Sequence, residues 1–264
     1  MACCTFNSFP LYFHPMKSLQ LLLFLVCGSL LGCSASATNS TPLATPTPAI
    51  LVFYKTAGFK HESIPVGRAA IQKLGQENGI KVDTTVNASA FTVDNLKQYD
   101  AVVFLSTTQD VLNDAQQAAF EQYIRSGKGF VGIHAATDTE YGWPWYNRLV
   151  GAYFSSHPAI QPAIIRVTNK THSATSFLPD AWPRTDEWYN FKNIQPTITV
   201  LATLDESSYS GGTNGATHPI AWHHEFDGGR AFYTAGGHTN ESYQEPLFLR
   251  HLLGGIQYAI GKRK

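Results

Sequence analysis

The sequence predicts an α/β domain that contains a mostly parallel sheet with helices on both faces and a strand-rich second half. Short, continuous apolar runs such as residues 50–54 are typical of strands that are buried on both faces. In the first half of the chain these runs alternate with amphipathic segments of helical length, and the connections between them are short. This alternation favours parallel strands that are joined by helices.

The expected elements follow one another in βαβαβαβ order over the first half of the chain. The first helix places Val66, Ala70 and Leu74 on one side, and Thr92 and Asn113 are expected to cap the next two helices. In chain order we expect strands at 50–54, 80–86, 100–105 and 129–133, with helices at 64–77, 92–96 and from 113 to the glycine at 127 between them. Beyond residue 159 we expect strands at 159–168, 197–204, 217–226 and 229–235, and a closing helix at 246–260.

The charge and cysteine content exclude several classes of function. The chain has 264 residues with 19 basic and 19 acidic side chains, so there is no electrostatic case for a nucleic-acid partner. None of the four cysteines lies beyond residue 33. The domain that follows therefore has no disulfide, no thiolate zinc site and no cysteine nucleophile.

The N-terminal segment has the pattern of a signal peptide of the lipoprotein type, which we place at residues 1–33. A lysine precedes a short apolar run, and Met16 is an alternative start. The run ends at residues 30–33 with a sequence that resembles a bacterial lipobox, which implies a lipid anchor on Cys33. The alternative is cleavage after Ala37, which would release a protein without the anchor.

A small, polar and proline-rich stretch at residues 34–48 is expected to be an extended linker, and the folded domain then occupies residues 49–264. This organisation predicts a protein of the cell envelope. It would be lipid-anchored on the periplasmic side or at the outer membrane, or otherwise secreted to the periplasm.

Two histidines stand where a site is expected. In open α/β sheets, ligands bind outside the carboxyl ends of the strands. His134 directly follows the strand at 129–133, and His238 follows two glycines after the strand at 229–235. By contrast, His172 is expected to be solvated, and His223 to lie on a sheet face. A site in which several histidines and a carboxylate hold a divalent metal is an open alternative. No pair of ligands at short sequence spacing supports such a site, so we assign no metal ligands and no cofactor.

Several known motifs are absent or misplaced. Residues 127–132 match G-x-G-x-x-G, but they follow a predicted helix and enter a predicted strand, the reverse of a dinucleotide site. The chain contains no Walker A loop, no G-x-S-x-G elbow and no H-E-x-x-H motif.

Long segments of the chain resemble the ThuA-like (trehalose utilisation) family. The resemblance covers essentially residues 50–261 and is carried by residues 53–65, 105–124, 127–158, 186–191 and 218–239. It implies a flavodoxin-like fold similar to that of the class I glutamine amidotransferases. In those enzymes the matching strand ends in a turn that bears the nucleophilic cysteine, whereas this chain has His134 at that position. The resemblance therefore implies the fold of an amidotransferase without its chemistry.

The resemblance also implies a sugar substrate, namely a disaccharide such as trehalose or its 3-keto derivative. Chemistry beside a 3-keto group needs a base for the C2 proton and an acid for the leaving glycosidic oxygen. We assign these roles to His134 and His238, and either Asp138 or Glu187 would orient one of them. The residues expected to bind the sugar are His61, Trp143, Trp145, Tyr189, His218 and Trp222.

Two alternatives stay open. One is a non-catalytic carbohydrate-binding lipoprotein, and the other is an accessory partner of a periplasmic sugar oxidoreductase. Glycoside hydrolysis by paired carboxylates is disfavoured, because Asp186 and Glu187 are adjacent and would point apart in an extended segment.

Overall fold

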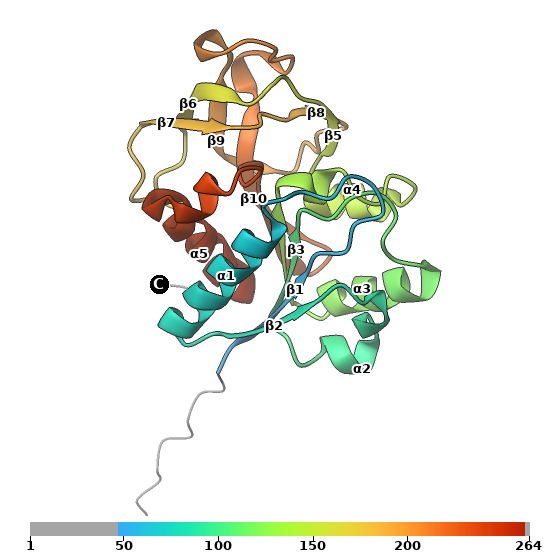
Figure 1. Cartoon of the computed structure of the whole chain (residues 1–264). Helices are drawn as coiled ribbons and strands as arrows, with labels where there is room; N and C mark the ends of the chain where they lie inside the picture. Colours follow the sequence, from blue (N-terminus) through green and yellow to red (C-terminus); the bar gives the residue numbers. More distant parts are fainter. Residues whose placement is uncertain (1–46, 262–264) are drawn as a thin grey trace, which may run out of the picture. The chain divides into compact units, whose positions relative to one another are not determined.

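The computed structural model describes residues 47–261 (Figure 1). The expected signal peptide, the lipid attachment at Cys33 and the linker up to residue 46 lie outside the described residues. Within residues 47–261, no helix is both long and apolar enough to cross a membrane.

The first half of the domain alternates strands and helices as expected. Its elements are β1 (Ala49–Phe53), α1 (Ile64–Asn78), β2 (Lys81–Thr85), α2 (Val93–Leu96), β3 (Ala101–Leu105), α3 (Asp114–Arg125) and β4 (Gly129–Ile133). The predicted caps are confirmed, since the side chain of Thr92 accepts a hydrogen bond from the backbone of Asn95, and that of Asn113 accepts one from the backbone of Gln116.

The second half is richer in strands. Its elements are α4 (Pro144–Val150), β5 (Tyr153–Ser156), β6 (Gln161–Val167), β7 (Ala181–Asp186), β8 (Asn190–Lys192), β9 (Thr199–Asp205), β10 (Pro219–Phe226), β11 (Gly229–Thr234) and α5 (Pro246–Ile260). The described residues also form a two-stranded sheet from β5 and β8.

One nine-stranded sheet, in the order β2-β1-β3-β4-β11-β10-β9-β6-β7, forms the centre of the domain. Strands β2, β1, β3, β4 and β11 are parallel and have the strand order of flavodoxin-like folds. The other four strands extend this sheet in antiparallel fashion. The predicted α/β fold with a mostly parallel first half is therefore confirmed.

Helices cover both faces of the parallel part. Figure 1 shows α1 and α5 on one face and α2, α3 and α4 on the other. Close packing of α5 on β11 depends on Gly255, because a Cβ atom at this position would overlap the ring of the fully buried Phe232. Strands β1, β3 and β4 are buried along their whole length, as their continuous apolar sequences predict.

The sequence did not predict α4, β5, β7 or β8. Strand β7 is instructive because its buried positions include Arg184 and Asp186, while Ala181, Pro183 and Thr185 are exposed. The strand therefore alternates between inward and outward residues, but polar side chains occupy inward positions. A hydrophobicity pattern cannot reveal such a strand, and a proline is tolerated because β7 lies at the edge of the sheet.

Candidate functional site

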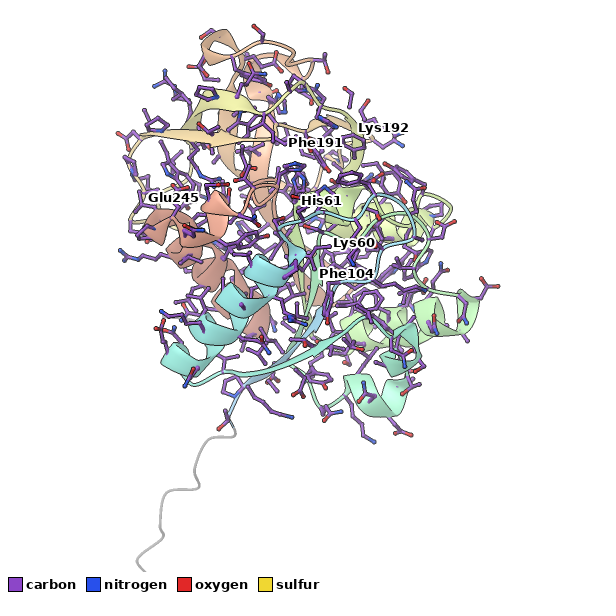
Figure 2. All side chains as sticks on the ribbon, in the orientation of Figure 1. Lys60, His61, Phe104, Phe191, Lys192 and Glu245 are labelled. Atoms are coloured by element: carbon purple, nitrogen blue, oxygen red, sulfur yellow. The ribbon has the colours of Figure 1, made fainter. Side chains whose placement is uncertain are left out.

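Four side chains from distant parts of the sequence meet beyond the carboxyl ends of β1, β4 and β11. They are His61, in the loop between β1 and α1, His134, directly after β4, Glu187, directly after β7, and His238, beyond the end of β11. We call these four residues the histidine cluster, and His61 is labelled in Figure 2. His134 has a φ of 50°, a left-handed conformation that costs free energy in a residue other than glycine and that is concentrated at functional sites.

The polar atoms of the cluster lie close together. Each of the four residues offers one nitrogen or oxygen atom that could bind a metal, and these four atoms all lie within 4.8 Å of one another. The Nε2 atom of His134 is 3.2 Å from Nδ1 of His238 and 3.5 Å from Oε2 of Glu187. The Nδ1 atom of His238 is 3.1 Å from the same carboxylate oxygen. His61, His134 and Glu187 are buried, so these groups interact away from bulk water.

The surrounding structure orients His134 and His238. The Nδ1–H group of His134 donates to the carbonyl oxygen of Ala235 at 2.8 Å, which leaves the lone pair of Nε2 directed at the cluster. The backbone N–H groups of Gly237 and His238 donate to the carboxylate of Asp186, at 2.9 and 3.1 Å. Asp186 thus positions the segment that carries His238.

The local charges shift the pKa values of three cluster residues. Burial, together with the neighbouring His134 and His238, lowers the pKa of His61 from 6.5 to about 3, so its imidazole is neutral. Burial opposes ionisation of both Glu187 and His238. The contacts of Glu187 with His134 and His238 outweigh burial for the carboxylate, and the contact with Glu187 outweighs it for His238. The pKa of His238 is raised and that of Glu187 is lowered, so the cluster combines a carboxylate with an imidazole that readily carries a proton.

Of the residues predicted for the site, His61, His134, Glu187 and His238 come together, and the ring of Tyr189 packs on His134 with 4.2 Å between centroids. Asp138 instead accepts hydrogen bonds from the side chains of Tyr141 and Gln109. Of the two candidates for an orienting carboxylate, Glu187 is therefore the one in contact with the histidines.

The three tryptophans predicted to bind sugar lie elsewhere. Trp143, Trp145 and Trp222 are buried in the hydrophobic core, and Trp222 is only 1% exposed. Their indole N–H groups donate to Glu121, Asp227 and the carbonyl of Val150, respectively. The predicted sugar contacts of these residues need correction, because their ring faces are covered by protein.

Two histidines also differ from expectation. His218 is fully buried and lies 2.8 Å from both the carboxylate of Glu206 and the backbone oxygen of Tyr189, so it supports Tyr189 rather than facing a ligand. His172, expected to be solvated, stacks on His223, and burial lowers its pKa to about 3.

Sequence reasoning assigned no role to His157, although its Nδ1 atom lies 3.0 Å from Oε1 of Glu187. The side chain of His157 is 42% exposed, which places it at the solvent side of Glu187. No sequence spacing links residues 157 and 187. Their contact depends on the two-stranded sheet of β5 and β8, which brings the two segments together.

A pocket of about 270 Å³ adjoins the cluster through His238. It is lined by Phe59, Glu62, Ser63, Ile160, His238, Thr239, Asn240 and Glu241. Phe59 and Ile160 are 65% and 48% exposed, so the pocket offers apolar surface beside carboxylate, amide and hydroxyl groups. This combination suits a sugar, which has apolar ring faces and hydroxyl groups at its edge.

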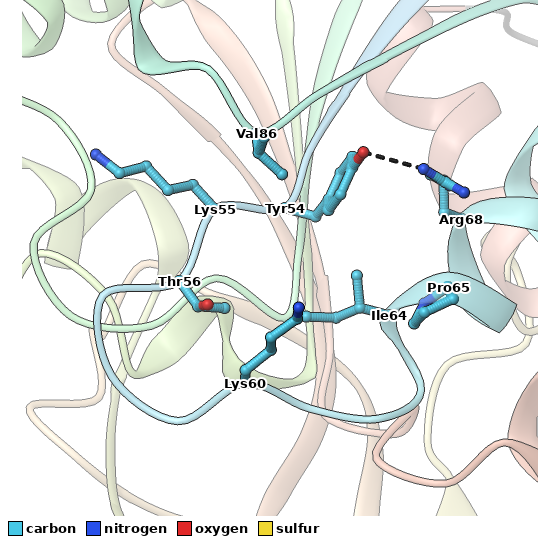
Figure 3. Close-up of a pocket in the computed structure, with 8 residues that line it drawn as sticks. All are labelled: Tyr54, Lys55, Thr56, Lys60, Ile64, Pro65, Arg68 and Val86. Atoms are coloured by element: carbon cyan, nitrogen blue, oxygen red, sulfur yellow. Dashed lines mark hydrogen bonds between the residues drawn. The ribbon is translucent and has the colours of Figure 1, made fainter.

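A second pocket, of about 390 Å³, lies beside the same loop (Figure 3). It is lined by Tyr54, Lys55, Thr56, Lys60, Ile64, Pro65, Arg68 and Val86. None of these residues belongs to the histidine cluster, so this larger cavity is not the candidate reaction site.

Comparison with known proteins identifies the family. The model of the ThuA family, described as trehalose utilisation, matches residues 49–259. The chain belongs to the ThuA family. No curated protein sequence gives a significant match.

Solved structures of ThuA-like proteins have the same fold. A ThuA-like protein from Bacteroides uniformis ATCC 8492 is 24% identical with a TM-score of 0.71, over 86% of this chain and 96% of that one. A second, from Parabacteroides merdae ATCC 43184, is 20% identical with a TM-score of 0.70, over 83% and 93% of the chains. A β-galactosidase from Rahnella sp. R3 is 13% identical with a TM-score of 0.55, over 80% of this chain but 31% of the enzyme. These similarities show that the fold is shared.

Proposed function

We propose that this ThuA family member is a cell-envelope enzyme that acts on a disaccharide such as trehalose or its 3-keto derivative, by proton transfer at the histidine cluster. The main support is the cluster itself, which brings two buried imidazoles and a buried carboxylate against the half-buried His238, beside the pocket that His238 lines. Buried polar groups that interact this closely are costly to maintain, and they concentrate at functional sites. The description of the family supports the class of substrate.

In the proposed reaction, the ketone at C3 acidifies the proton at C2. A base removes this proton, the electron pair forms a double bond between C1 and C2, and the bond from C1 to the glycosidic oxygen breaks. An acid protonates the departing oxygen, and water then adds to the double bond to complete hydrolysis. Both proton transfers need groups within hydrogen-bonding reach of the sugar.

We assign these transfers to His134 and His238, with Glu187 holding their orientation. His134 suits the base, because its Nδ1–H group donates to Ala235 and the lone pair of its Nε2 atom is directed at the cluster. His238 suits the acid, because its ring lines the pocket and contacts Glu187. In the same proposal, Phe59 supports a sugar ring and Asn240 binds a hydroxyl group.

The test is an NMR time course of the purified full-length chain with trehalose and with 3-keto-trehalose. We expect new sugar signals with at least one of them, and a rate lower by about 100-fold or more in His134→Ala and in His238→Ala. His223→Gln is the control, because His223 lies on β10 outside the cluster and should leave the rate unchanged. Full turnover in both alanine variants would exclude the assigned roles.

The exposed apolar side chains of the pocket also favour a second candidate, a non-catalytic carbohydrate-binding lipoprotein. In that case the sugar signals broaden on binding but the sugar remains chemically unchanged. An accessory role would instead give weak sugar binding alone and activity only when a periplasmic sugar oxidoreductase is added.

A further inference from the structure

We infer that the histidine cluster is a binding site for one divalent transition-metal cation, with His61, His134, Glu187 and His238 as its ligands. The inference deepens the proposed function. It rests on that proposal only for the reaction that the cation would assist. The binding itself can be measured without a sugar.

The spacing of the polar atoms fits a common cation. Ligand atoms that lie about 2.0–2.2 Å from one metal ion, at tetrahedral or right angles, are separated from each other by about 3.0–3.5 Å. The three distances among Nε2 of His134, Nδ1 of His238 and Oε2 of Glu187 are 3.1, 3.2 and 3.5 Å. These three atoms therefore form one triangular face of a coordination shell, with His61 close enough to provide the next ligand.

The three imidazole rings are arranged around a point rather than stacked. The ring planes of His61 and His134 meet at 89°, those of His61 and His238 at 86°, and those of His134 and His238 at 76°. Their centroids are 4.7 to 5.1 Å apart. Steeply crossed rings at this spacing can each direct one nitrogen to a shared centre, whereas stacked rings cannot.

His61 provides an independent observation. Its Nδ1 atom is buried and has no hydrogen-bond partner within the described part of the chain. A buried polar atom without a partner costs about 1–3 kcal/mol. A role in cation binding explains why the fold places this imidazole against two other imidazoles and a carboxylate, where a hydrocarbon side chain would pack at no such cost.

The groups behind the cluster resemble the outer shell of metal sites. Histidines that bind metals commonly donate their second ring N–H to a backbone carbonyl or a carboxylate, which fixes the tautomer. His134 does so through Ala235. Glu187 has its other oxygen 3.0 Å from His157, and Asp186 holds the backbone of His238. The ligands are thus oriented before a cation binds.

The ligand set also selects the class of cation. Three imidazoles and one carboxylate suit zinc, iron, cobalt, nickel or manganese, whereas calcium and magnesium prefer a shell made of oxygen atoms. The domain has no cysteine, so it offers no thiolate for softer ions. A cation here would polarise a sugar ketone and lower the pKa of a bound water. That water would then replace His134 as the base, and His134 and His238 would act as ligands instead of transferring protons.

The experiment uses the purified full-length chain, stripped with a chelator and titrated with zinc, cobalt and manganese. Calorimetry and elemental analysis should give one cation per chain for at least one of these metals, and bound cobalt should show an absorption band in the visible range. His61→Asn and Glu187→Gln should each weaken binding by about 100-fold. His223→Gln, which alters the separate pair of stacked histidines, is the matched control and should bind as the original chain does.

Absence of stoichiometric binding at micromolar free cation overturns the inference. So does binding that neither His61→Asn nor Glu187→Gln weakens. Sugar turnover by chain that contains no cation and binds none on titration refutes the metal site and leaves the proposed function intact. One bound cation without turnover of any tested sugar does the opposite, because it supports the metal site and counts against the proposed function.

Discussion

Replacement of Asp186 by asparagine should destabilise the fold and loosen the histidine cluster together. Asp186 is fully buried, and its carboxylate accepts four hydrogen bonds, from the backbone of Glu187, Gly237 and His238 and from the hydroxyl of Ser242. An asparagine of the same shape keeps one oxygen, but its amide group places a donor against two existing donors. A hydrogen bond to a charged group contributes about 1.5–3 kcal/mol, so the loss of two should cost about 3–6 kcal/mol.

For a domain of this size, such a loss lowers the melting temperature by about 10 °C. The assay is thermal unfolding followed by circular dichroism, combined with calorimetric titration of the cation. Glu187→Gln is the matched control, since Glu187 is the next residue but its side chain contacts His134, His157 and His238. We expect the control to weaken cation binding with a much smaller effect on unfolding. A melting temperature of Asp186→Asn within about 2 °C of the original would refute the reasoning.

Three further predictions concern the core. Burial lowers the pKa of His251 from 6.5 to about 4, so the unfolded chain takes up this proton first, and stability falls by about 3 kcal/mol as the pH drops from about 6.5 to 4. His251→Asn keeps a donor for the carbonyl of Ala174 and should lose this part of the pH dependence in urea titrations, and an unchanged dependence would contradict the assignment. Gly255→Ala should cost about 1–3 kcal/mol in the same titrations because of its overlap with Phe232, and a variant of unchanged stability would show that the α5 packing is looser than described. Trp222→Phe should lower the free energy of unfolding by about 2 kcal/mol but leave the KM for any sugar substrate unchanged, whereas a raised KM at unchanged stability would restore Trp222 to the binding site.

The sequence was sufficient for the parallel half of the fold because burial on both faces leaves continuous apolar runs, as in β1, β3 and β4. Once these strands are located, their carboxyl ends point to His134 and His238, since ligands bind at the carboxyl ends of parallel strands. The hydrophobicity pattern failed for β7, where Arg184 and Asp186 occupy inward positions and form ion pairs and hydrogen bonds there.

The cluster as a whole could not be predicted from spacing. Residues 61, 134, 187 and 238 are separated by about fifty residues or more, and only the folded sheet brings them within 4.8 Å. The tryptophans show why a predicted sugar contact can be wrong. Trp222 lies on an eight-residue strand, and its sequence neighbourhood does not reveal whether an aromatic ring faces a ligand or the core.

The most direct test of the account is hydrogen–deuterium exchange at C2 of 3-keto-trehalose, followed by proton NMR in D2O. Removal of the C2 proton at the histidine cluster is the central step of the proposed reaction, whether an imidazole or a bound water acts as the base. We predict that the C2 signal disappears faster with the full-length chain than in buffer, and that His134→Ala and His238→Ala reduce this exchange to the buffer rate. Release of a 3-keto sugar that keeps hydrogen rather than deuterium at C2 would contradict the account.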